Sequence, residues 1–186
     1  MRALSQPFGH PRLVELFREA TVKDPEYAGA WFGLGMALEG SGGAFEEQIV
    51  AYKQSIALDP SNAPAHANLG NALWQRGEFD GAVTEYREAI RCDPNQANAH
   101  DNLGLALEQR GDLDGAVKEY RESIRCDPNN AKAHSNFGSA LQKRGELDGA
   151  VKEYREAIRC DPNDAKAHYN LGVALEQHGD LDGAVK

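Results

Sequence analysis

Histidine recurs at a fixed spacing in this chain, and its ring nitrogens are common metal ligands in proteins. The four residues are 34 positions apart: His66, His100, His134 and His168. Zinc needs several ligand atoms about 2 Å from one point. Equivalent side chains one repeat apart do not converge in this way. We therefore expect no metal site and interpret each histidine as a core residue between helices.

Cysteine follows the same spacing, at Cys92, Cys126 and Cys160. The odd number fits no closed disulfide framework, and the sequence contains no Cys-X-X-Cys motif. Neighbouring helices lie about 8–10 Å apart, whereas a disulfide needs Cα atoms within about 7 Å. We expect free thiols in a reducing compartment.

Catalytic motifs are absent from the sequence. There is no His-Glu-X-X-His, no phosphate-binding loop and no Gly-X-Ser-X-Gly. The repeated carboxylates Asp112 and Glu146 stand at predicted helix starts, where the helix dipole favours negative charge. The sequence therefore predicts neither an enzyme nor a cofactor site.

A row of asparagines offers a different chemistry. Its members are Asn68, Asn102, Asn136 and Asn170, again 34 residues apart. A side-chain amide has both a donor and an acceptor, so it can pair with a peptide unit whatever side chain that unit carries. The row could therefore hold an extended backbone. Alternatively, each amide bonds a neighbouring helix, and the sequence leaves both readings open.

A second stripe changes from one copy of the repeat to the next. Residues 97–130 and 131–164 match at 25 of 34 positions, and five of the nine differences fall within about 100° of a helix surface. A constant frame with one changing face is what a binding surface requires. Together with the asparagines, the predicted peptide-binding residues are Trp74, Asp101, Leu105, Lys132, Ser135, Lys166 and Tyr169. The two aromatic residues either anchor a ligand or cover a neighbouring helix.

The elements that position these residues follow from the 34-residue period, which is typical of solenoids. In residues 63–96, an apolar stripe predicts a first helix over 63–76. Gly77 supplies the left-handed residue after it, and Asp93-Pro94-Asn95 ends a second helix. Gly70 lets the two helices approach each other, with Tyr86 filling the remaining volume.

These residues resemble the tetratricopeptide repeat (TPR) family. The family pattern is a bulky residue, Leu-Gly, a large apolar residue, a small residue, an aromatic, another small residue and proline. It falls on His66, Leu69-Gly70, Leu73, Ala82, Tyr86, Ala89 and Pro94, and recurs in register in the following units. The resemblance implies an all-α, right-handed α-solenoid of antiparallel helix pairs. It also implies that the first helices line a concave, ligand-binding face.

The His-X-Asn-Leu-Gly pattern is similar to that of the superhelical domain of O-linked GlcNAc transferases, where asparagines hold peptide backbone. We expect a single solenoid over residues 10–186 after a disordered tail at 1–9. Its repeats are a half repeat at 10–27, full repeats at 28–62, 63–96, 97–130 and 131–164, and a truncated repeat at 165–186.

Composition limits the partners. The chain has 186 residues and a net charge of −9, without a run of Lys or Arg, so it is a poor match for nucleic acid or an anionic membrane. No apolar run approaches the roughly 18–20 residues that cross a bilayer. We expect a cytoplasmic protein.

The leading hypothesis is a non-catalytic module that binds a protein or peptide partner as an extended segment in the concave groove. A second hypothesis is a substrate-recognition arm of a larger, glycosyltransferase-like enzyme. A third is a scaffold that self-assembles head to tail through its incomplete terminal repeats.

Overall fold

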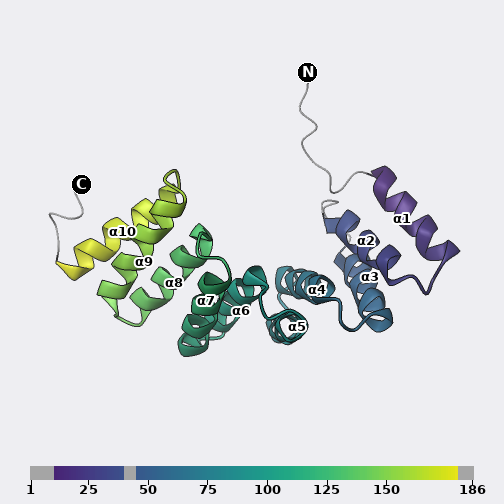
Figure 1. Ribbon diagram of the computed structural model, residues 1–186, viewed down its shortest axis with the longest axis horizontal. Coiled ribbons are helices and arrows are strands. Elements are labelled where there is room, and N and C mark those ends of the chain that lie inside the picture. Colours follow the sequence, from purple (N-terminus) through teal and green to yellow (C-terminus); the bar gives the residue numbers. More distant parts are fainter. Residues whose placement is uncertain (1–10, 40–44, 180–186) are drawn as a thin grey trace, which may run out of the picture. The chain divides into compact units, whose positions relative to one another are not determined.

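The computed structural model describes residues 11–39 and 45–179, and every regular element within them is a helix (Figure 1). The ten helices of this part of the chain are α1 (Pro11–Lys23), α2 (Ala28–Glu39), α3 (Phe45–Leu58), α4 (Ala63–Gln75), α5 (Phe79–Cys92), α6 (Ala97–Gln109), α7 (Leu113–Cys126), α8 (Ala131–Lys143), α9 (Leu147–Cys160) and α10 (Ala165–His178). The predicted all-α fold of helix pairs is confirmed. The predicted tail at 1–9, the turn at 40–43 and the segment 180–186 of the truncated repeat lie outside the described residues.

The chain divides into two compact units, residues 1–94 and 95–186. In the first unit, α2 pairs with α3 and α4 with α5, while α1 packs on α2. In the second unit, α6 pairs with α7 and α8 with α9, and α10 follows on α9. The first helices α4, α6, α8 and α10 carry the residues that the sequence assigns to binding.

Helix α4 shows why these segments start and stop where they do. Asn62 Oδ1 accepts a hydrogen bond from Ala65 N at 3.0 Å, which satisfies one free donor of the first turn. After the helix, Gly77 has a φ of +85°, and Glu78 N donates to Leu73 O at 2.9 Å. This left-handed cap is the one predicted for Gly77. Gly111 and Gly145 repeat it, with φ of +81° and +79°.

Each helix pair closes around one tyrosine. A Cβ atom placed on Gly70 would lie 2.6 Å from Tyr86 Cε1, and one on Gly104 would lie 2.6 Å from Tyr120 Cε1. No side chain fits at those distances, so the first helix needs glycine there. The expected contact between Gly70 and Tyr86 is confirmed.

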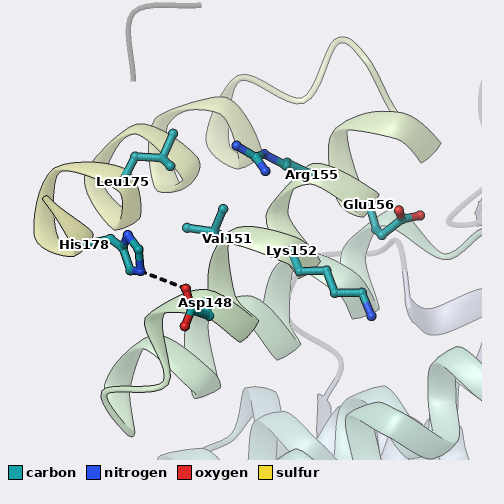
Figure 2. Close-up of a pocket in the computed structure, with 7 residues that line it drawn as sticks. All are labelled: Asp148, Val151, Lys152, Arg155, Glu156, Leu175 and His178. Atoms are coloured by element: carbon teal, nitrogen blue, oxygen red, sulfur yellow. Dashed lines mark ion pairs between the residues drawn. The ribbon is translucent and has the colours of Figure 1, made fainter. Parts of the chain in front are cut away.

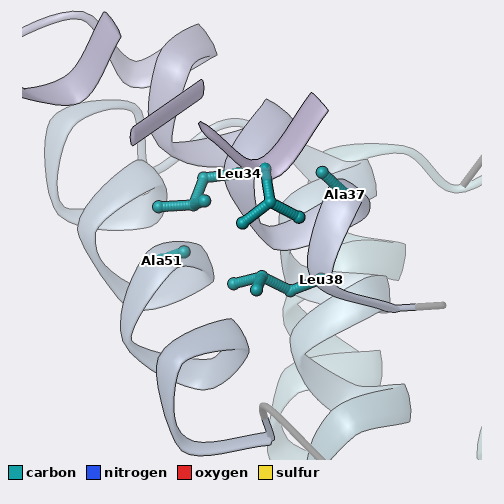
Figure 3. Packing of buried hydrophobic residues seen from close by; sticks show 5 residues of the cluster. Leu34, Ala37, Leu38 and Ala51 are labelled. Atoms are coloured by element: carbon teal, nitrogen blue, oxygen red, sulfur yellow. The ribbon is translucent and has the colours of Figure 1, made fainter. Parts of the chain in front are cut away.

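One apolar cluster of the first unit lies between α1, α2 and α3 (Figure 3). Leu34 and Leu38 of α2 meet Ala51 of α3, and Val14 of α1 joins them. Phe17 and Trp31 are partly buried and pack against this cluster. Helix α1 thus covers an apolar face of α2 in the way that a preceding second helix would.

Candidate functional site

Three of the four constant histidines each contact a glutamate on the second helix of the same repeat. His134 Nδ1 lies 2.8 Å from Glu153 Oε2, and its Nε2 lies 3.2 Å from Pro128 O. The hydrogen bond with Glu153 raises the pKa of His134, against the effect of burial. His66 and His100 are also buried and contact the equivalent glutamates at 2.7 and 2.8 Å.

The interpretation as core histidines is therefore confirmed at three positions, but it is wrong for His168, which is exposed. The reason is that no described helix follows α10 to cover that side chain. Among residues 11–39 and 45–179, no group of three or more His, Cys, Asp or Glu is placed to hold a metal ion. The three cysteines are free.

The second unit contains a groove of about 640 Å³ on its first helices. We call this surface the α6–α8–α10 groove. Its walls come from α6, α8, the loop before α10 and the first turn of α10. Seven of the eleven predicted binding residues line it: Asp101, Asn102, Leu105, Lys132, Ser135, Asn136 and Lys166.

Four predicted residues lie elsewhere. Asn68 and Trp74 belong to α4 in the first unit, and Tyr169 and Asn170 lie on α10 but do not line the groove. The Trp74 ring packs edge-on against Phe79, with ring centroids 4.8 Å apart. Trp74 thus covers the second helix of its own repeat, as the alternative reading held. Tyr169 is 72% exposed.

The floor of the groove carries a buried carboxylate. Asp101 is 8% exposed, and its Oδ1 accepts a hydrogen bond from Asn136 Nδ2 at 3.0 Å. Burial raises the pKa of Asp101, and the Asn136 hydrogen bond and the charge of Lys132 only partly offset that effect. Sequence reasoning placed Asp101 on an open face, but the neighbouring first helix covers most of it.

Asn136 therefore bonds a neighbouring helix and also lines the groove. All four asparagines of the row are half-buried, and Asn68 lies near the hydroxyl of Tyr52. At Asn136 the side-chain amide bonds directly to an adjacent first helix. The two readings of the row are thus compatible at one position.

Further along the same helices, polar side chains join α6, α8 and α10. Lys143 Nζ lies 2.5 Å from Glu108 Oε1, and Gln142 Nε2 donates to Gln177 Oε1 at 2.7 Å. The two residues of each pair are 35 positions apart in the sequence, which is one repeat plus one residue. These contacts link α6 to α8 and α8 to α10.

Side chains of the same stripe accept hydrogen bonds from two buried tyrosines. Tyr120 donates its hydroxyl hydrogen to Glu108 Oε2 at 2.8 Å, and Tyr154 donates to Gln142 Oε1 at 2.9 Å. Burial raises the pKa of Tyr154 to about 12, so this hydroxyl stays protonated at neutral pH. Part of the variation at this stripe is therefore structural, because Glu108 and Gln142 accept the hydrogen bonds of these tyrosines.

Sequence reasoning missed the loop before α10. Asp161, Asn163 and Asp164 line the groove, and Asp164 Oδ1 caps α10 by accepting from Lys166 N at 2.9 Å. The repeated Asp-Pro-Asn motif marked this loop, but it was interpreted only as a helix end.

A smaller hollow of about 310 Å³ lies between α9 and α10 (Figure 2). His178 Nε2 lies 2.8 Å from Asp148 Oδ1 there. One repeat earlier, Arg144 Nη1 and Asp114 Oδ1 are 2.9 Å apart at the equivalent positions. The pair is a structural contact between repeats, and the hollow marks the end of the described helices.

Every helix within the two described ranges is too short or too polar to cross a lipid bilayer. Comparison with known proteins identifies the family of the repeat. Residues 41–77, 70–111, 109–145 and 138–179 each match the family described as TPR repeat. No curated protein matches the sequence closely enough to count as a relative.

Several solved structures share the fold. MamA is 26% identical, with a TM-score of 0.75 over 82% of this chain and 89% of that one. YrrB, described as a TPR protein with an unusual peptide-binding site, is 24% identical, with a TM-score of 0.77 over 92% and 88%. Pseudomonas aeruginosa pilF is 22% identical, with a TM-score of 0.79 over 92% and 80%.

Proposed function

Because the chain belongs to the tetratricopeptide repeat (TPR) family, we propose that it is a non-catalytic interaction module. Its α6–α8–α10 groove binds an extended peptide or a partner segment of that form. The observation that carries this proposal is that seven of the eleven predicted binding residues line one groove of about 640 Å³. The fold that it shares with YrrB is one on which a peptide-binding site exists.

The groove offers the two kinds of contact that an extended peptide needs. Asn102 and Asn136 bring amides to its wall, and an amide can pair with a main-chain N–H or C=O. Leu105 adds an apolar surface between them. These amides are the support for the asparagine-ladder mode of binding, which the resemblance to O-linked GlcNAc transferases implies.

Binding by selected peptides tests the proposal. Peptides would be selected by phage display on the full chain, and their dissociation constants measured by fluorescence anisotropy. The test variant is Asn102→Ala with Leu105→Ser, because α8 carries serine at the position of Leu105. We expect affinity to fall by about tenfold or more, as for the loss of one or two good contacts.

The matched control is Lys118→Ala, which removes an exposed side chain of α7 that does not line the groove. It should leave the dissociation constant unchanged. If the control weakens binding as much as the groove variant, or if the groove variant binds like the parent, the peptide site lies elsewhere. Melting temperatures of all three proteins separate lost binding from lost folding.

Head-to-tail self-association is a second candidate. It is favoured by apolar side chains on α1, where Leu16 is 51% and Val22 is 80% exposed, and by the hollow beside Val151 (Figure 2). Heterologous contacts of this kind give rings or filaments. Sedimentation velocity over a wide concentration range tests it, and a single monomeric species throughout would reject it.

A further inference from the structure

We propose that the α6–α8–α10 groove selects a peptide carrying an arginine or lysine, and that Asp101 receives this basic side chain. The inference rests on the proposed function, since it names the chemistry of the peptide that the groove binds. It assigns a specificity role to one residue on the groove floor.

Asp101 is buried, yet it lines the groove. A carboxylate has about four acceptor positions, and the hydrogen bond from Asn136 uses one of them. Lys132 acts on Asp101 through its charge and not through a hydrogen bond. A cation that enters the groove would stabilise this buried carboxylate, because it compensates the negative charge and uses the remaining acceptor positions.

The repeat itself does not need a carboxylate here. The equivalent position holds Ala67 in α4, Ser135 in α8 and Tyr169 in α10. Those helices form without a charge at this place, so helix pairing does not explain Asp101. Burial also raises the pKa of its carboxyl, which shows that the surrounding groups leave its charge under-compensated.

The lysines on the rim favour the opposite ligand, an acidic segment, but more weakly. Lys132 and Lys166 are exposed, and ion pairs in contact with water contribute little to affinity. An ion pair at Asp101 forms away from water, where a charge-assisted hydrogen bond is stronger. Arginine fits best, because its planar, weakly hydrated guanidinium binds a carboxylate through two parallel bonds.

The test uses acetylated, amidated nonapeptides, whose termini carry no charge. Each peptide has Arg, Lys, norleucine or Glu fixed at one position among neutral residues. Binding to the full chain is measured by fluorescence anisotropy. At one position we expect Arg to bind about tenfold or more tightly than norleucine, as for one good charged contact.

Asp101→Asn keeps an acceptor for Asn136 and removes the charge. It should abolish the preference for Arg while changing the affinity for the norleucine peptide by less than about twofold. Asp101→Ser, which takes the residue of α8, should do the same and guards against a folding defect in the first variant. Lys132→Asn takes the residue at the equivalent position of α6, Asn98, and should tighten Arg binding by a few-fold by removing repulsion.

The outcomes separate this inference from the proposed function. If peptides bind but both Asp101 variants keep the Arg preference, the role of Asp101 is rejected and the peptide groove stands. A preference for Glu that Lys132→Asn abolishes would also reject it, and would make the lysines the selective residues. If no peptide of any charge binds, the proposed function and this inference both fall.

Discussion

The first helices of the two units present different chemistry on the same frame. In the first unit, the Phe32 ring lies 6.1 Å from that of Tyr52, and Trp74 packs on Phe79. In the second unit, the corresponding face carries a carboxylate, amides and lysines around a groove. The glycine–tyrosine contact beneath is the same in both. Surface chemistry and helix pairing are thus set by separate positions of one repeat.

The tyrosine hydroxyls show where this separation is incomplete. Tyr120 and Tyr154 in the second unit bond to side chains of the changing stripe. In the first unit, the buried Tyr52 hydroxyl has no hydrogen-bond partner among the described residues. Gln48 and Asn68 lie near it without the geometry of a hydrogen bond. In the same unit, Tyr86 donates its hydroxyl hydrogen to Asn71 Oδ1 at 2.9 Å, so the missing acceptor is particular to the α2–α3 pair.

The largest expected loss of stability comes from removing the glycine–tyrosine contact that both units share. Tyr120→Ala empties the space against Gly104 and should lower the free energy of unfolding by about 3–5 kcal/mol. Leu105→Ser changes only the groove face and should cost about 1 kcal/mol. Urea denaturation followed by circular dichroism measures both. Equal losses of unfolding free energy would contradict the inference that separate positions set helix pairing and surface chemistry.

Removing single hydroxyls sharpens the comparison between the units. Tyr120→Phe loses a hydrogen bond to a charged group and should cost about 1.5–3 kcal/mol, whereas Tyr154→Phe loses a neutral one and should cost about 0.5–1.5 kcal/mol. Tyr52→Phe removes an unsatisfied group and should be neutral or stabilising. The same denaturation measurements decide, and a large cost at Tyr52 would show that its hydroxyl has a partner.

The constant histidine face should respond to pH. The folded-state pKa of His134 is raised through Glu153. Its extra stability is therefore fully present below the unfolded value of about 6.5 and is lost as pH rises through the folded value. We expect His134→Gln to cost more free energy of unfolding at pH 6 than at pH 8. An equal cost at both pH values would show that the His134–Glu153 pair carries no ionic stabilisation.

The contribution of Asp101 to stability should depend on pH with the opposite sign. The expected change in stability is the smallest of these. The folded-state pKa of Asp101 is raised by burial, so its ionised form costs stability at neutral pH, and protonation relieves the cost as pH falls. Asp101→Asn should therefore raise the melting temperature slightly at pH 7, by an amount that shrinks toward pH 4. A lower melting temperature at pH 7 would mean that Asp101 is a structural anchor.

The period and the constant residues were enough to predict the frame. Gly77 takes its left-handed cap, and Gly70 meets Tyr86 as expected. Helical spacing also placed Leu105 and Lys132 on the changing stripe of their own helices, and both line the groove.

The details of the groove could not be predicted, because they depend on the distance between helices one repeat apart. Hydrogen bonds such as Asn136 to Asp101 join residues 35 apart, and no pattern within one helix fixes that contact. Burial of Asp101 follows from the same packing. The packing of the Trp74 ring could not be predicted, because it depends on Phe79. This residue replaces the leucine found at the start of α7 and α9.

Nuclear magnetic resonance mapping tests the central claim most directly. A selected peptide would be titrated into the isotope-labelled chain, and backbone amide shifts followed residue by residue. We expect the largest changes in α6, α8 and the first turn of α10, around Asn102, Leu105 and Asn136, with little change on the outer faces of α7 and α9. Changes confined to α7 and α9, or spread evenly over all helices, would contradict binding in the α6–α8–α10 groove.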